Sequence, residues 1–129
     1  MAVPHGSARP DLVYALYRQA TERLDAGAPR AAAEILELAV EHEPEQASLH
    51  EALGRAYFAS ARPGLARRQF ERAAELDPSD AYAHFGIGRC FEREGHLARA
   101  VPHLKLACAL ADRAVYRQAL QRVQARLAA

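Results

Sequence analysis

The residues best suited to metal chemistry in this sequence are three histidines, His50, His84 and His103. His50 and His84 occupy equivalent positions if the chain repeats with the interval that separates them. Equivalent side chains on neighbouring packed helices lie ~10 Å apart, whereas zinc holds an imidazole nitrogen at ~2.1 Å. The two rings are therefore too far apart to share one ion without bending the helices. We expect these histidines to be packing residues and predict no metal site.

Patterns for other kinds of catalysis are also missing. The sequence contains no phosphate-binding loop, no nucleophile elbow and no HExxH helix. Cys90 and Cys108 are far apart and have no CxxC spacing, so we interpret them as small hydrophobic residues that stay reduced in a cytosol. These observations predict a protein that is not an enzyme and that uses no cofactor.

Length and composition indicate one all-helical domain. The chain has 129 residues, half of them hydrophobic, with no tryptophan, and alanine, the residue with the highest helix propensity, is abundant. No segment approaches the ~20 consecutive apolar residues of a membrane span, and the N-terminal MAVPHGSARP has no apolar run. We therefore expect a cytoplasmic protein without a secretion signal or membrane contact.

Charge is nearly balanced overall but unevenly distributed. The net charge of +1 predicts no steering of the whole molecule toward nucleic acid. Residues 31–46 carry five Glu and no Lys or Arg, whereas residues 112–129 carry four Arg and one Asp. The Arg-rich end leaves weak, salt-sensitive binding of nucleic acid or an acidic surface as an alternative function. A charge run on a terminal helix is more often a solvated face.

The most specific pattern is an internal repeat. Residues 47–80 form one unit, whose marker residues are Leu53, Gly54, Tyr57, Ala66, Phe70, Ala73 and Pro78. One period later stand Gly88, Phe91, Ala100, Leu104 and Ala107, and one period earlier stand Ala32, Leu36, Ala39 and Pro44. These residue types at these offsets resemble the tetratricopeptide repeat, a helix–turn–helix unit with a period of about 34 residues.

The resemblance implies an all-α fold, a right-handed α-solenoid of three antiparallel helix pairs with a C-terminal capping helix. We expect a flexible tail over residues 1–10 and a single domain over 11–129, with repeats at about 13–46, 47–80 and 81–111. The capping helix is expected at about 112–127, outside the repeat pattern, with an apolar stripe of Tyr116, Leu120, Val123 and Leu127 facing the last repeat.

Local signals place the helix ends. We expect helices at 11–25, 29–42, 45–60, 63–76 and 97–110, and a third-repeat helix that begins with Asp77 as its N-cap and Pro78 at its first position. Gly27 and Gly95 suit the turns inside the pairs, and Gly54 lets paired helices approach closely. Pro102 is expected to kink its helix unless that helix starts near Arg99.

The resemblance also implies a concave groove built from the first helix of each pair. The positions expected to bind a partner are Tyr14, Tyr17, Thr21, Glu51, Arg55, Phe58, Tyr82, Phe85, Arg89 and Arg93. Leu24, Asp25, Ser48, Ala59 and Glu92 complete the groove-facing offsets.

Aromatic residues and Arg are enriched at binding hot spots, and an Arg fork binds a carboxylate at two points. We therefore predict an adaptor that holds a protein or peptide partner with acidic and apolar residues.

Two further outcomes are left open by the residues. The aromatic side chains could instead pack against the capping helix or against one another, and copies of the chain could form a homo-oligomeric scaffold. Some members of the family grip the C-terminal carboxylates of heat-shock chaperones with a Lys/Asn/Asn/Lys/Arg clamp. The corresponding positions here are Tyr17, Thr21, Ala52, Tyr82 and Gly86, so that route is not predicted.

Overall fold

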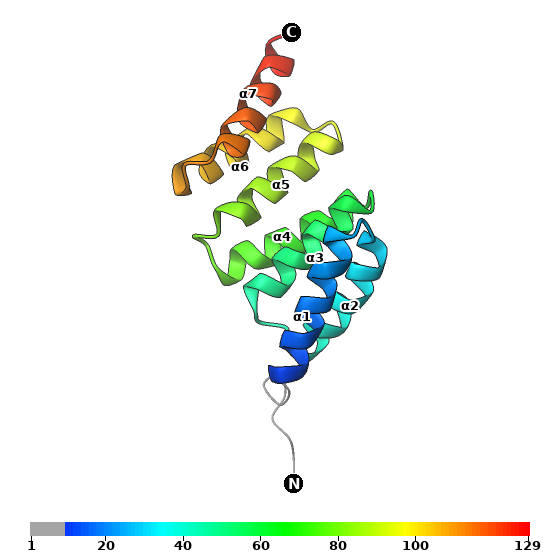
Figure 1. Cartoon of the computed structure of the whole chain (residues 1–129). Helices are drawn as coiled ribbons and strands as arrows, with labels where there is room; N and C mark the ends of the chain where they lie inside the picture. Colours follow the sequence, from blue (N-terminus) through cyan, green and yellow to red (C-terminus); the bar gives the residue numbers. More distant parts are fainter. Residues whose placement is uncertain (1–9) are drawn as a thin grey trace.

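The computed structural model describes residues 10–129, and every regular element within that range is an α-helix. The helices follow one another from one end of an elongated molecule to the other, so the first and the last helix lie at opposite ends (Figure 1). Their bounds are α1 (Pro10–Asp25), α2 (Pro29–His42), α3 (Ala47–Ala59), α4 (Pro63–Leu76), α5 (Ala81–Arg93), α6 (Leu97–Leu110) and α7 (Ala114–Ala128).

The helices stack as a solenoid. Each helix packs against the next one in the chain, and each first helix also contacts the next first helix, α1 with α3, α3 with α5 and α5 with α7. The first helices form one layer and the second helices α2, α4 and α6 form the other (Figure 1). The predicted all-α architecture of three helix pairs followed by a further helix is therefore confirmed. None of the described helices is long and apolar enough to cross a membrane.

The turn inside each helix pair has the same geometry. Gly27, Ala61 and Gly95 stand at the same place in the three pairs and have φ values of 77°, 61° and 84°. In the second pair the Arg62 amide donates to the Tyr57 carbonyl and the Ala61 amide to the Phe58 carbonyl, the two hydrogen bonds of a Schellman motif. Ala61 is thus held in the left-handed region where its two counterparts are glycine.

Phe70 of α4 lies at the centre of the core, between two glycines. A Cβ atom at Gly54 of α3 would lie 2.8 Å from the Phe70 ring, and one at Gly86 of α5 would lie 2.7 Å from it. In the third pair, a Cβ at Gly88 would lie 2.6 Å from Leu104. Glycine at these positions lets a ring or a leucine fit against helix backbone, as expected for Gly54. We call this contact layer, Phe70 and Leu104 with the three glycines, the seam.

The predicted start of the third pair is wrong. α5 begins at Ala81, and its N-cap is Asp80, whose carboxylate accepts from the Ala83 amide at 3.1 Å. Asp77 instead accepts from the amide and hydroxyl of Ser79, so its side chain closes a turn after α4. An Asp at position 80 caps as well as one at 77, and the stacking of the pairs decides between them.

Smaller differences concern other helix ends. α3 begins at Ala47 rather than at residue 45 and ends at Ala59. Pro10, expected in the tail, is the first residue of α1, and the rest of that predicted tail lies outside the described residues. α6 begins at Leu97 and continues through Pro102. Proline removes the hydrogen bond to the Ala98 carbonyl, but Ala98 is exposed and water can satisfy it.

α7 occupies the place of the first helix of a fourth pair, although we expected it to lie outside the repeat. It packs on α6 and contacts α5, as α5 packs on α4 and contacts α3. Gly88 and Phe91 of α5 are buried, whereas the residues one period later, Arg122 and Ala125, are exposed. α7 is the last helix of the described residues, and this face of it is open to solvent.

The apolar stripe of α7 is shorter than predicted. Tyr116 and Val123 are buried and Leu120 is half-buried, but Leu127 is 47% exposed. Leu127 stands beside Gly95 and Leu97 at the α5–α6 turn, where no further helix covers the last turn of α7.

Candidate functional site

The layer of first helices forms one wall on which the predicted partner-binding residues stand. The repeat period places side chains from α1, α3 and α5 at matching positions, as in the column formed by Tyr14, Ser48 and Tyr82. Two hollows among the described residues open on the wall, one between α1 and α3 and one between α3, α5 and α7. We call them the α1–α3 cavity and the α3–α7 cavity.

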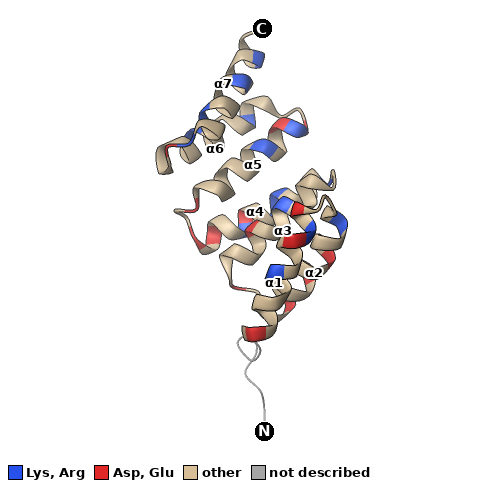
Figure 2. Ribbon diagram, in the orientation of Figure 1, with Lys and Arg blue, Asp and Glu red and all other residues tan. Residues whose placement is uncertain are grey.

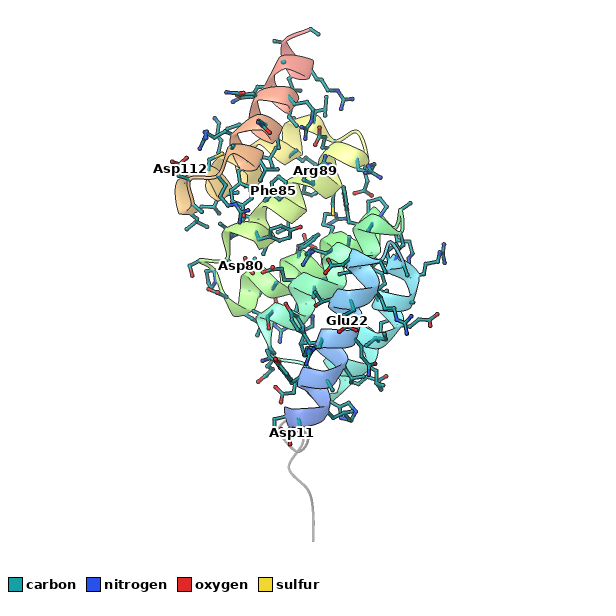
Figure 3. The ribbon with its side chains drawn as sticks, in the orientation of Figure 1. Asp11, Glu22, Asp80, Phe85, Arg89 and Asp112 are labelled. Carbon is teal, nitrogen blue, oxygen red and sulfur yellow. The ribbon has the colours of Figure 1, made fainter. Side chains whose placement is uncertain are left out.

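The α3–α7 cavity has a volume of about 260 Å³. Arg55 and Phe58 of α3 form one side, and Tyr82, Phe85 and Arg89 of α5 form the other, so the structure brings five of the ten predicted residues together. Figure 3 shows Phe85 and Arg89 on α5, with Asp80 at the start of that helix. The remaining lining residues are Phe70, Gly86 and Val115.

Aromatic rings form a continuous row through this cavity into the core. Phe70 lies 6.1 Å from Tyr82, Tyr82 lies 5.7 Å from Phe85, and Phe85 lies 4.8 Å from Tyr116 of α7, measured between ring centroids. Phe85 is only 8% exposed. The predicted groove aromatics therefore do pack on one another and on the capping helix, and yet Phe58, Tyr82 and Phe85 still line an open cavity.

Three arginines of the wall lie over aromatic rings. The guanidinium carbons of Arg89 and Arg93 are 5.2 Å and 4.6 Å from the centroid of Phe58, and that of Arg55 is 5.9 Å from Tyr82. Such stacking holds a guanidinium in place and leaves its N–H edges free. The rings therefore set the positions of the positive charges.

The buried carboxylate of Glu92 on α5 pairs with Arg89 of the wall and with Arg122 of α7, so it joins the two helices. It accepts from Arg89 at 2.6 Å and from two nitrogens of Arg122 at 2.6 Å and 2.8 Å. The Arg122 hydrogen bonds, followed by those from Arg89, lower the pKa of Glu92. Among residues 10–129, Arg55 and Arg93 have no carboxylate within 4.0 Å, so they keep their charge available to a ligand.

The acidic member of the predicted set, Glu51, is half-buried on α3 beside the N-cap Asp80. Burial and then the neighbouring Asp80 carboxyl raise the pKa of Glu51 to about 8, while Arg55 opposes that change. Glu51 is thus largely protonated at neutral pH and does not cancel the charge of Arg55.

The α1–α3 cavity is larger, about 350 Å³, and has a different lining. Tyr14 and Tyr17 come from α1, and Ser48 and Leu49 come from α3; Pro10, Val13, Glu43 and Gln46 complete it. Tyr14 is 65% exposed, whereas Val13 and Leu49 are buried. Thr21, also in the predicted set, donates its hydroxyl to the Tyr17 carbonyl of its own helix at 2.9 Å.

A family model described as tetratricopeptide repeat matches residues 17–62 and 51–123, well over half of the chain. The chain belongs to the tetratricopeptide repeat family. No curated protein matches it significantly.

Solved structures of other tetratricopeptide domains share the fold at low sequence identity. The first such domain of Spaghetti (RPAP3), bound to the HSP90 peptide SRMEEVD, superposes with a TM-score of 0.88 at 17% identity over 92% of this chain and 95% of that one. The Yersinia enterocolitica type III secretion chaperone SycD, bound to a peptide of the translocator YopD, gives 0.82 at 19% over 90% and 95%. The Sgt2 domain from Aspergillus fumigatus gives 0.89 at 15% over 96% and 84%.

Sequence reasoning missed the contribution of α7 to the wall of this tetratricopeptide protein. Val115 lines the α3–α7 cavity and Tyr116 stacks on Phe85. The available signal was spacing, since Tyr116 follows Tyr82 by one repeat period. The place of Asp80 beside Glu51 was also missed, because sequence does not distinguish an N-cap residue from a residue of the groove.

The histidines have structural partners. The His50 ring lies 2.7 Å from the Pro44 carbonyl and 2.8 Å from Gln69 Oε1, and the His84 ring lies 3.1 Å from the Pro78 carbonyl. Each of these two histidines thus hydrogen-bonds the proline that precedes its own helix, which fixes the connection between pairs to the helix that follows. Within residues 10–129, no group of three or more His, Cys, Asp or Glu side chains is placed to hold a metal ion.

Proposed function

We propose that this tetratricopeptide protein is a non-enzymatic adaptor that binds a protein partner through a peptide segment laid along the wall of α1, α3 and α5. The observation that carries the proposal is the α3–α7 cavity, where aromatic rings form an apolar hollow and two arginines without carboxylate partners among the described residues stand at its edge. Solved relatives of this fold hold peptides of HSP90 and YopD, which supports a peptide as the ligand class.

The chemistry of the wall favours a segment with apolar and acidic residues. An apolar side chain fills the hollow between Phe58, Tyr82 and Phe85 and removes apolar surface from water. A carboxylate beside it is placed to accept from Arg55 or Arg93 in two-point fashion. Since Glu51 is largely protonated at neutral pH, the local charge of the free wall is positive.

Two other functions that the sequence left open are less well supported. Two of the arginines on α7 have carboxylate partners within the chain, since Arg122 binds Glu92 and Arg117 binds Asp112. Few arginines of α7 therefore remain free to contact the phosphates of a nucleic acid. End-to-end association would need an apolar terminal face, and α7 exposes the charged Arg122 there together with Leu127.

A cytoplasmic location is part of the proposal. Cys90 and Cys108 are both free thiols, which suits a reducing compartment. Burial raises the pKa of the Cys90 thiol to about 12, so it stays protonated and unreactive.

An affinity capture from native cytosol tests the proposal. We expect the wild-type chain to retain a protein that the Arg55→Ala/Arg93→Ala double variant loses. Arg68→Ala is the control, because Arg68 is an exposed arginine on α4, outside the wall. Equal retention by all three chains would show that the wall is not the binding surface.

A further inference from the structure

The two cavities of the wall differ in charge and lie at different levels along α3, where Ser48 lines the first and Arg55 the second. Arg55 and Arg89 line the α3–α7 cavity, and Arg93 stands beside it over Phe58. Among the described residues, the lining of the α1–α3 cavity contains no Lys or Arg, and its acidic member is Glu43. Figure 2 shows the basic segments of the carboxyl-terminal half of α5, which have no counterpart at the start of α1.

Both hollows are apolar at their base. Val13 and Leu49 are buried beneath the α1–α3 cavity, and Phe70 and Phe85 are buried beneath the α3–α7 cavity. Tyr14, two-thirds exposed at the rim of the first hollow, is apolar surface that no described residue covers. Each hollow is thus suited to one aliphatic or aromatic side chain.

We infer that the wall recognises one extended peptide through two apolar side chains about six residues apart, with a carboxylate next to only one of them. The side chain flanked by the carboxylate enters the α3–α7 cavity, and the other enters the uncharged base of the α1–α3 cavity. This inference rests on the proposed function, which requires only that a peptide binds the wall.

The spacing follows from helix geometry. Moving from the α1–α3 cavity to the α3–α7 cavity crosses between one and two helix spacings of about 10 Å each. Along α3, Ser48 lines the first cavity and Arg55 the second, a separation of about 10 Å at ~1.5 Å per residue. The combined path is roughly 20 Å, which an extended chain at ~3.3 Å per residue spans in about six residues.

Charge complementarity sets the polarity. A carboxylate at the α3–α7 cavity meets Arg55 and Arg93, which have no acidic partner within the described residues. At the α1–α3 cavity the same carboxylate would face Glu43 and, within residues 10–129, no lining cation. A peptide with its acid beside the wrong anchor therefore loses the ion pair and gains repulsion.

A selection of random dodecapeptides displayed on phage, with the full chain as bait, tests the inference. We expect enriched peptides to contain two apolar residues separated by five to seven positions, with Asp or Glu adjacent to one of them. Enriched peptides with a single apolar anchor, or with acids spread evenly, would overturn the two-anchor inference. A selection without any enrichment would overturn both this inference and the proposed function.

Variants separate the two claims. Ser48→Gln and Tyr14→Ala alter exposed or rim positions of the α1–α3 cavity, so both chains should fold. We expect each to weaken a selected two-anchor peptide about tenfold and to leave unchanged a matched peptide whose second anchor is Ser. Arg55→Ala/Arg93→Ala should weaken both peptides, and Arg68→Ala should weaken neither.

The outcomes are distinct. If Ser48→Gln and Tyr14→Ala bind the two-anchor peptide as the wild type does while Arg55→Ala/Arg93→Ala binds it weakly, the α1–α3 cavity is not an anchor site and the proposed function stands. If none of the wall variants changes binding, both claims fail. Circular dichroism of each variant confirms that a lost affinity is not lost folding.

Discussion

The seam and the wall share helices α3 and α5, and they tolerate change very differently. At the seam, Phe70 fills the space between Gly54 and Gly86 so closely that even a methyl group would collide. On the wall, Arg55, Arg89 and Arg93 lie over ring faces with their N–H edges open. The residues of the seam are constrained by volume, and those of the wall by charge. Mutations should therefore be able to change stability and binding separately.

The largest effect should come from filling the seam. Gly86→Ala places a Cβ atom 2.7 Å from the Phe70 ring, and the same ring lies 2.8 Å from where a Cβ atom of Gly54 would stand. We expect a loss of about 2 kcal/mol in the free energy of unfolding, since overpacking outweighs the gain in helix propensity. Urea denaturation measures it.

The control for this prediction is Gly64→Ala. Gly64 also lies in a helix, but nothing stands within 4 Å of a Cβ atom there. Its substitution should be neutral or slightly stabilising. Equal losses for the two variants would mean that helix geometry in general, rather than the seam, responds to the added methyl.

The second-largest loss of stability should come from breaking the ion pairs of Glu92, which join α5 to α7. Glu92→Gln removes the carboxylate that binds Arg122 and Arg89. We expect a loss of about 1–2 kcal/mol at neutral pH, a discounted value because Arg122 is half exposed. The exposed pair of Arg117 and Asp112 offers the control, and Asp112→Asn should cost less than about 1 kcal/mol.

The pH dependence of this loss has a definite sign. The pKa of Glu92 is lowered by folding, so its contribution is present above its ordinary value of 4.5 and is lost as the pH falls through the folded value. Wild type and Glu92→Gln should therefore converge in stability in acid. A constant difference down to about pH 2 would contradict the ion-pair account.

Glu51→Gln should have a smaller effect of the opposite sign. Burial beside Asp80 raises the pKa of Glu51 from 4.5 to about 8, so the folded chain holds a proton that the unfolded chain releases. Stability of the wild type should fall as the pH rises from about 4.5 to about 8. We expect the variant to be more stable by about 1 kcal/mol at about pH 9 and nearly equal at about pH 4.

Thermal melting at the two pH values measures this difference. Glu45→Gln, at an exposed position in the α2–α3 connection, removes the same charge and serves as the control. A gain at high pH in both variants would assign the effect to net charge rather than to the Glu51–Asp80 contact.

The smallest expected effect is in the turns, where neither volume nor charge decides. Ala61→Gly relieves an alanine with a φ of 61°, and we expect a gain of about 0.5 kcal/mol after the added freedom of the unfolded chain is counted. The reciprocal change, Gly27→Ala, should lose about 1 kcal/mol, since only backbone strain opposes it. Chemical denaturation of both variants checks this, and a loss for Ala61→Gly would contradict it.

The order of the helices was predictable because the repeat consists of residue types that helix packing and turn geometry require at fixed positions. Gly54 and Gly88 recur at the repeat period because a side chain would separate packed helices, and Gly27 and Gly95 recur because the turn needs a positive φ. The exact ends of the helices were harder to predict from the sequence. Asp77 and Asp80 are equally good caps in sequence, and only the stacking of α5 on α4 selects the second.

The positions that form the wall were predictable from the sequence, but the cavities and contacts of the wall were not. The ten residues named from the repeat offsets include five that meet at the α3–α7 cavity. Sequence left open whether the groove aromatics pack on the capping helix, and it could not reveal that Glu92 binds both Arg89 and Arg122 or that Asp80 shifts the proton affinity of Glu51. Most of these contacts join side chains that meet across neighbouring helices.

The sequence by itself determined the period, the helix pairs and which side of each first helix faces outward, since these follow from local propensity and from a spacing held through the chain. Tertiary structure alone decided which charges of the wall stay available and where the hollows lie. The reason is that a charge is neutralised, stacked or desolvated by whatever stands next to it in space, and on this wall those neighbours come largely from the next first helix, as between α3 and α5 or α5 and α7.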